Sequence, residues 1–124
     1  MDLRLVAIVA FGGAIGAVLR YALPSLISNQ NSIFITLGIN LLGSLLLGIL
    51  FGFLATGSNI SEGLVLLIGT GFIGAFTTMS TFAFEAMETS QNNAFHGLYY
   101  ILSTVFGSIF LAWLGYSAII HYSS

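Results

Sequence analysis

The sequence predicts an all-α membrane protein with four transmembrane helices. Hydrophobic residues make up 57% of the 124 residues and charged residues only 5%, whereas soluble domains carry about 25% charged residues. Four apolar windows, each near the roughly 20 residues that a helix needs to cross a bilayer core, are separated by short polar stretches. The windows lack the alternating polarity typical of membrane β-strands. We therefore expect residues 1–124 to form a single transmembrane domain.

The few charges and the lack of cysteine exclude several classes of function. Two basic and four acidic residues give a formal charge of -2, which is too weak to attract nucleic acid. Without cysteine there are no disulfides, thiolate metal sites or thiol nucleophiles. No nucleophile, base and orienting group are grouped together, so we do not expect an enzyme.

The first helix is expected at about residues 5–23, ended by Pro24 and the polar stretch Ser28–Ser32. A cleaved signal peptide has a shorter apolar core and precedes a polar mature chain, whereas another apolar run follows here, so we interpret this segment as a retained helix. Arg20, near its end, is expected either to reach the membrane surface or to attract anions at a vestibule mouth.

The orientation of the chain is weakly specified. Lys and Arg residues normally mark cytoplasmic loops, yet the only two, Arg4 and Arg20, lie at opposite ends of the first helix. Two copies inserted in opposite directions would form a pair related by a two-fold axis in the membrane plane. Dual topology is therefore one interpretation of the charge pattern.

The second helix, expected at about residues 33–54, carries hydrogen-bonding side chains on one face. Thr36, Asn40 and Ser44 follow one another at intervals of four residues. Gly48 and Gly52, like Gly12 and Gly16 in the first helix, are typical of a close helix–helix contact.

The third helix, expected at about residues 63–88, contains an unstable centre. Gly69, Gly71 and Gly74 precede a hydroxyl-rich run that includes Thr77 and Thr78, which predicts a break near residues 74–78. Carbonyls freed within a membrane need buried protein, water or a cation as partner. The alternative is an unbroken helix whose hydroxyls bond back to the preceding turn.

The fourth helix, expected at about residues 95–120, repeats the polar face of the second with Tyr100, Thr104 and Ser108. Single polar groups hold membrane helices together at about 0.6–2 kcal/mol each, and two complete stripes are more than this role requires. We interpret them as a polar pathway built from neutral donors. His96 and His121 lie at the helix ends without neighbouring carboxylates and do not indicate a metal site.

Three segments resemble motifs of the fluoride channel family called Fluc or CrcB, and the resemblance covers essentially the whole chain. Residues 12–20 (GGAIGAVLR) resemble the glycine-rich opening of the family, which ends in arginine. Residues 38–44 (GINLLGS) resemble its asparagine motif in helix 2, and residues 71–85 (GFIGAFTTMSTFAFE) resemble its helix 3 signature. The number and order of helices also agree.

The resemblance implies an antiparallel dual-topology dimer in the cell inner or plasma membrane, surrounded by lipid. Its two pores would export fluoride passively and so lower the toxicity of this ion in the cytoplasm. The resemblance also implies a structural sodium ion that is not transported, held by the backbone carbonyls of Gly74 and Thr77 at the break in the third helix. Oxygen ligands suit such a hard cation.

The resemblance also implies which residues conduct the anion. Arg20 would supply the vestibule charge. Hydroxyl, amide and aromatic-edge groups can replace the hydration of fluoride without trapping it. The implied pathway residues are Asn40, Met79, Phe82, Ser80, Thr81, Tyr100, Thr104 and Ser108.

Met79 departs from the family pattern, in which phenylalanine is expected, because a thioether offers no ring edge. A homodimer could conduct with an altered constriction or more slowly, or the chain could need a different second subunit in a heterodimer. We favour the conducting homodimer, since Asn40, Phe82, Arg20 and the helix 4 stripe remain. A rival interpretation, a dual-topology proton-coupled exporter, needs a carboxylate within the first helix, where there is none. A scaffold protein would leave both polar stripes unexplained.

Overall fold

The computed structural model describes residues 1–27 and 32–124, and its described elements are all helices. Residues 28–31, most of the stretch expected to end the first helix, lie outside the described residues. Four segments are long and apolar enough to cross a membrane, which confirms the predicted fold class: Leu3–Leu26, Ser32–Ala55, Glu62–Asn92 and Ala94–Ser123. In chain order the elements are α1 (Leu3–Leu26), α2 (Ser32–Ala55), α3 (Glu62–Val65), η1 (Leu66–Ile73), α4 (Gly74–Phe76), α5 (Met79–Asn92) and α6 (Ala94–Ser123).

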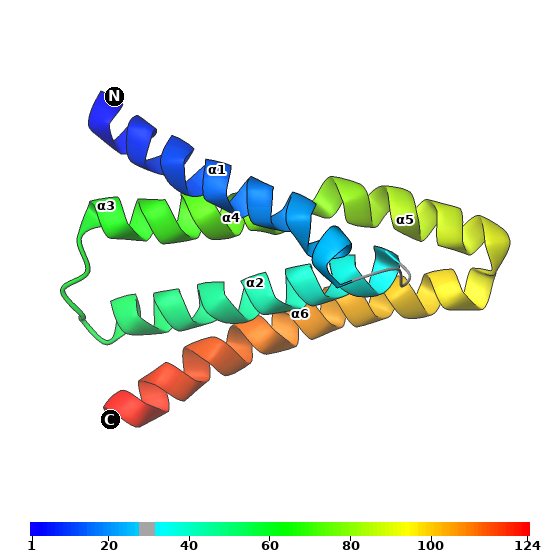
Figure 1. Cartoon of the computed structure of the whole chain (residues 1–124). Coiled ribbons are helices and arrows are strands. Elements are labelled where there is room, and N and C mark those ends of the chain that lie inside the picture. The colour runs from blue at the N-terminus through cyan, green and yellow to red at the C-terminus, as the bar shows by residue number, and fades with distance from the viewer. Residues whose placement is uncertain (28–31) are drawn as a thin grey trace.

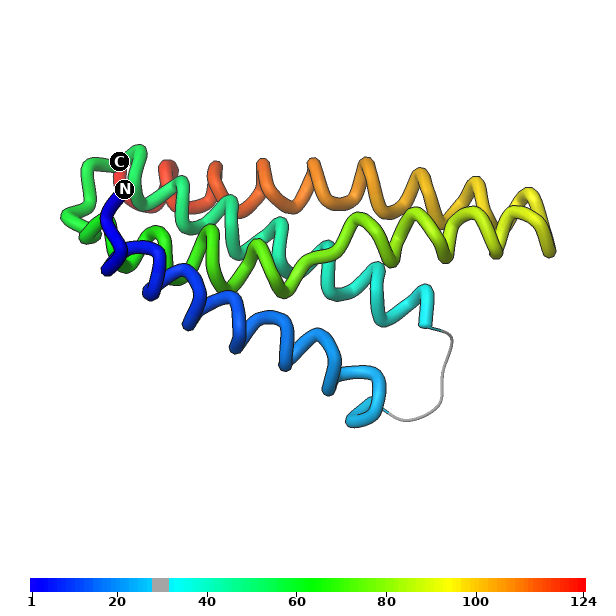
Figure 2. Tube along the Cα trace, turned by 90° about the horizontal axis from the view of Figure 1, so that it is seen from above, coloured from blue at the N-terminus to red at the C-terminus, as the bar shows by residue number. Residues whose placement is uncertain are grey.

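The four spans run back and forth, so that both termini lie at the same end of the molecule (Figures 1 and 2). Helix α2 packs along α6, and α1 packs against η1 and α4. Helix α5 packs against the first part of α6, with Phe82, Ala86 and Tyr100 buried between them. The second and fourth spans therefore lie side by side, as a pathway shared by their polar stripes requires.

Glycine brings the backbones of neighbouring helices together. A Cβ atom added at Gly16 would overlap the carbonyl oxygen of Phe72, and one added at Gly48 would overlap the carbonyl oxygen of Ala112. Small residues commonly allow such close approach in membranes. The glycine pairs of the first and second helices thus belong to the contacts of α1 with the third span and of α2 with α6.

The third span is interrupted, as predicted, and the interruption lies at Thr77 and Thr78. Both residues are extended, with φ and ψ of -74° and 155° at Thr77 and -147° and 118° at Thr78. Helix α5 then restarts, with the Thr78 hydroxyl accepting a hydrogen bond from the backbone N–H of Thr81. The π-helical turn η1 before the break was not predicted; in it the N–H of Gly74 donates to the carbonyl of Gly69, five residues earlier.

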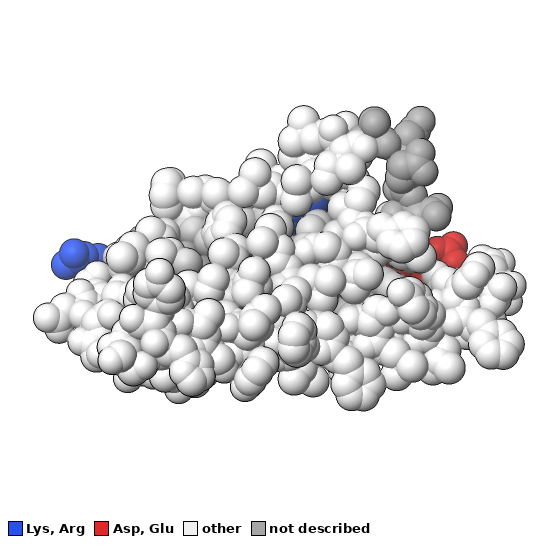
Figure 3. Space-filling view, turned by 90° about the horizontal axis from the view of Figure 1, so that it is seen from below, with Lys and Arg blue, Asp and Glu red and all other residues white. Residues whose placement is uncertain are grey.

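Charged side chains are few, and Figure 3 shows one face on which they lie at only a few places. Many large apolar side chains are exposed along the helices, among them Phe51, Phe106, Phe110 and Trp113. Such an extent of exposed apolar surface does not occur in soluble monomers. It fits contact with lipid.

Candidate functional site

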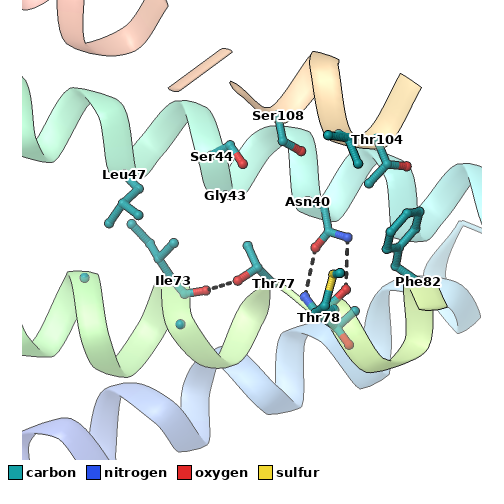
Figure 4. A pocket seen from close by; sticks show the side chains of 14 residues that line it. Asn40, Gly43, Ser44, Leu47, Ile73, Thr77, Thr78, Phe82, Thr104 and Ser108 are labelled. Atoms are coloured by element: carbon teal, nitrogen blue, oxygen red, sulfur yellow. Dashed lines mark hydrogen bonds between the residues drawn. The ribbon is translucent and has the colours of Figure 1, made fainter. Parts of the chain in front are cut away.

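A cavity of about 320 Å³ lies between α2, the third span and α6 (Figure 4). At the break in the third span it brings Asn40 and Ser44 of one predicted polar stripe together with Thr104 and Ser108 of the other. No lining side chain is titratable, so the polar groups of the cavity are hydroxyls, one amide and peptide groups. The polar side chains that line it are Asn40, Ser44, Thr77, Thr78, Thr104 and Ser108.

Asn40 bonds to the backbone at the break. Its Oδ1 accepts a hydrogen bond from the N–H of Thr78 at 2.8 Å, and its Nδ2 donates to the carbonyl of Thr78 at 3.0 Å (Figure 4). Both residues are buried. The amide therefore satisfies two peptide groups that the interrupted helix cannot, and the second N–H of its Nδ2 remains to serve the cavity.

Two further groups complete the end of α4. The hydroxyl of Thr77 donates to the carbonyl of Ile73 at 2.9 Å, so a bond back to the preceding turn accompanies the break and does not replace it. The Nε of Arg20 donates to the carbonyl of Ala75 at 3.1 Å. A cation is favourable at the C-terminal end of a helix. Arg20, half-buried, thus binds the interrupted span instead of only reaching for the membrane surface.

The carbonyl oxygens of Gly74 and Thr77 accept no hydrogen bond that we find in the described part of the chain. The N–H of Thr78, which would bond to Gly74 in a continuous helix, is taken by Asn40. Gly74 lies exposed on the surface of the chain. Two free carbonyls on one chain fit half of an oxygen-ligated site for a hard cation.

The hydroxyl of Thr104 is buried without a hydrogen-bond partner among the described residues. The residue is 5% exposed and lines the cavity. A buried hydroxyl that lacks a partner is unfavourable by about 1–3 kcal/mol, and such a group calls for an explanation in function. In this cavity it is a donor available to a small anion.

A second cavity, of about 480 Å³, meets the first at Thr78. Arg20, Thr36, Thr81 and Glu85 line it together with apolar residues. From its place one helical turn after the hydroxyl-rich run, the sequence allows Glu85 to cap a helix, to pair with Arg20 or to reach the membrane surface, with a structural role preferred. In the structure Glu85 lines the same cavity as Arg20.

Glu85 is buried, at 8% exposed, and its carboxylate accepts a hydrogen bond of 2.8 Å from the hydroxyl of Tyr100. No ion pair between Glu85 and Arg20 is found in the described ranges. The ring of Tyr100 meets that of Phe82 edge to face, with centroids 5.2 Å apart. Tyr100 therefore lines neither cavity and bonds to Glu85 of the second, while Thr104 and Ser108 of the same predicted stripe line the first.

The remaining predicted residues follow the break at the start of α5. Phe82 is buried at 5% exposed, whereas Met79 is 73% exposed on a single chain, although both line the first cavity. Ser80 is exposed and Thr81 half-buried. A constriction formed by Met79 and Phe82 stays a prediction, because Met79 is exposed on a single chain and could narrow a pore only together with a second chain.

Replacing Tyr100 by phenylalanine is expected to destabilise the protein by about 1–3 kcal/mol, because the buried carboxyl group of Glu85 loses its hydrogen-bond donor. Thermal unfolding in detergent, monitored by size-exclusion chromatography, measures this loss of stability. Tyr99→Phe is the matched control, since Tyr99 is 70% exposed. Equal stability of both variants would show that the bond to Glu85 contributes nothing.

The chain is similar to known proteins over most of its length. The family model described as "CrcB-like protein, Camphor Resistance (CrcB)" matches residues 7–116. The chain is 40% identical over 118 residues to a "Fluoride-specific ion channel FluC" from Pyrococcus furiosus, which covers 94% of this chain and 96% of the relative. A protein of the same name from Campylobacter jejuni strain 81-176 is 40% identical over 92% of this chain. "Fluoride-specific ion channel FluC 1" from Geobacillus kaustophilus is 40% identical over 87%.

Proposed function

Since the chain belongs to the CrcB-like family of membrane proteins, we propose that it is a fluoride channel, which lets fluoride leave the cell passively and so lowers its cytoplasmic concentration. Its place is the plasma or inner membrane, which it crosses four times. No reaction is catalysed. The structure supports a proposed route for the anion and proposed groups that would replace its water.

The observation that supports this proposal most directly is the cavity at the break, with its unpaired Thr104 hydroxyl. Fluoride loses strong hydration on entry and needs hydrogen-bond donors in return. The cavity offers Ser44, Ser108, Thr104 and the free N–H of Asn40, none of which carries a charge. Neutral donors can bind an anion and release it again, which conduction requires.

We propose that the half-buried Arg20 draws anions into the second cavity, where Thr81 and Ser80 flank the entrance. From there the path leads past Phe82 and Tyr100 toward Thr104 and Ser108. The burial of Glu85 in a hydrogen bond with Tyr100 supports this order, because the nearest carboxylate is then engaged by a donor and repels an anion less.

A second copy in opposite orientation completes the channel in this proposal. Gly74 and Met79 lie exposed on one chain beside the break, and a partner would cover them. The two pores then lie on either side of a two-fold axis in the membrane. We favour a homodimer, and a heterodimer with a related chain is the competing outcome.

Vesicles that contain only this purified protein are expected to release fluoride and to retain chloride. Fluoride-loaded proteoliposomes are monitored with a fluoride electrode after the membrane potential is short-circuited with a potassium ionophore. Empty vesicles and chloride-loaded vesicles serve as controls. Fluoride release no faster than from empty vesicles would contradict a homodimeric channel, and recovery of release with a co-expressed relative would identify a heterodimer.

A structural sodium ion on the two-fold axis is part of the proposal. The free carbonyls of Gly74 and Thr77, repeated in the second copy, would provide four oxygen ligands, which suit a hard cation such as sodium. Among the described residues no cluster of His, Asp and Glu that could bind a metal is found. Bound there, the ion would offset the negative ends of the facing carbonyl dipoles and hold the two breaks together.

Replacing sodium by N-methyl-D-glucamine throughout purification is expected to destabilise the dimer, because a ligand that binds only the folded state stabilises it by mass action. The midpoint of thermal unfolding should rise with sodium concentration and reach a plateau. Potassium at equal ionic strength controls for screening. The same midpoint in all three cations would argue against the sodium site while leaving the fluoride proposal intact.

A further inference from the structure

We infer that Asn40 is a positioning residue that holds the third span in its broken form and thereby keeps the carbonyls of Gly74 and Thr77 free for a cation. The inference rests on the sodium site of the proposed function and deepens it. It assigns the asparagine amide to the backbone at the break, in addition to its place at the anion cavity.

The geometry of Thr78 makes its bond to Asn40 selective for one conformation. In an extended residue the N–H and the carbonyl point to the same side, as they do in the hydrogen-bonded pairs of a β-sheet. In a helix they point in opposite directions along the axis. One carboxamide can therefore bond to both groups of Thr78, at 2.8 and 3.0 Å, only while Thr78 is extended.

The competing state is a continuous helix, and it would consume the proposed ligands. In that helix the N–H of Thr78 would bond to the carbonyl of Gly74, and the N–H of Thr81 to that of Thr77. In the structure, the N–H of Thr78 donates to the side chain of Asn40 instead (Figure 4). The N–H of Thr81 donates to the hydroxyl of Thr78. Each side-chain acceptor thus releases one carbonyl.

Sodium and Asn40 therefore stabilise the same state of the span. A buried peptide group without a partner is costly within a membrane, so loss of the amide favours re-formation of the helix through Thr78, which is 8% exposed. Two interactions that favour one conformation strengthen each other reciprocally. Weakening the bond from Asn40 to Thr78 must then weaken sodium binding, although Asn40 supplies no ligand to the ion.

The first test uses the wild-type protein. The exchange rate of the Thr78 N–H is measured by hydrogen–deuterium exchange of the purified channel in sodium. Mass spectrometry with electron-transfer fragmentation resolves this single amide. We expect it to exchange at least about tenfold more slowly than a free backbone amide, because Asn40 accepts it in a buried site. Exchange at the rate of an open loop would overturn the inference.

The second test measures the sodium concentration that gives half-maximal thermal stabilisation in Asn40 variants. Asn40→Ala removes both bonds and is expected to raise this concentration by about tenfold, within the usual range of coupling between sites. Asn40→Asp keeps the acceptor for the N–H of Thr78, so a smaller rise in the sodium concentration is expected. This variant keeps the test possible if Asn40→Ala does not fold. Ser44, one helical turn after Asn40, lines the same cavity, so Ser44→Ala is the control. It should not change the sodium concentration that gives half-maximal stabilisation.

The alternative roles of Asn40 give different results. A residue that only donates to the anion would lower fluoride release and leave the sodium requirement unchanged. A residue with only a general packing role would lower the unfolding midpoint equally in sodium and in N-methyl-D-glucamine. Either result, found in every Asn40 variant that folds, would overturn the inference. If wild-type vesicles release no fluoride while Thr78 is protected and the sodium requirement shifts, the proposed function fails and the inference stands.

Discussion

Replacing Gly48 by alanine is expected to destabilise the folded chain by at least about 3 kcal/mol, at the upper end of the usual cost of overpacking. The added Cβ atom would overlap the carbonyl oxygen of Ala112 in α6, which is backbone and cannot move aside as a flexible side chain can. Helices α2 and α6 must then separate, and the cavity between their polar faces opens. The yield of dimer and its unfolding midpoint in detergent measure the effect.

Gly38→Ala provides the matched control for this prediction. It introduces the same atom into the same helix, but beyond its chain neighbours and the nearby backbone of α2 no described atom lies within 4 Å of the added Cβ. Because alanine is a better helix former than glycine by about 1 kcal/mol, this variant should be as stable as the wild type or more so. If both variants lost stability equally, the contact of Gly48 with α6 would not be the cause.

The sequence alone predicted the four spans and the position of the break, because both depend on local signals. Length and apolarity define a membrane helix, and glycines followed by threonines weaken one. The stripe of Thr36, Asn40 and Ser44 also predicted which face of the second span turns inward. That face meets Thr104 and Ser108 in one cavity.

The partners of the polar groups could not be predicted in the same way. Asn40 bonds to Thr78, and Arg20 to Ala75, across 38 and 55 residues of the chain. Such pairs depend on how the helices pack, which no periodicity specifies. Tyr100 belongs to the same stripe as Thr104 and Ser108, yet its hydroxyl is bonded to Glu85 beside another cavity, because the rings of Phe82 and Tyr100 pack between the two helices. The π-helical turn lies where the third span packs against α1, a contact between segments far apart in the sequence.

Replacing Thr104 by valine is expected to lower fluoride release by about 10- to 100-fold, because a hydrogen bond to a charged group contributes about 1.5–3 kcal/mol. The same change should leave the protein as stable as before, or raise its stability by about 1 kcal/mol, since valine has the shape of threonine and removes a buried hydroxyl without a partner. A function lost while stability is kept distinguishes a site for an ion from a structural contact. Release from proteoliposomes and thermal unfolding of the same preparation measure both effects.

The control for Thr104 is its neighbour Ser103, which is half-buried on α6 and lines neither cavity. Ser103→Ala should change release by less than about twofold, as surface changes away from a site usually alter interactions by no more than about 0.5 kcal/mol. A Thr104→Val protein that is clearly less stable than the wild type would mean that the hydroxyl has a partner in the assembled dimer. A stable variant with unchanged release would mean that fluoride passes without it. Only a stable, slow channel agrees with a hydroxyl that has no partner among the described residues and is available to bind the passing anion.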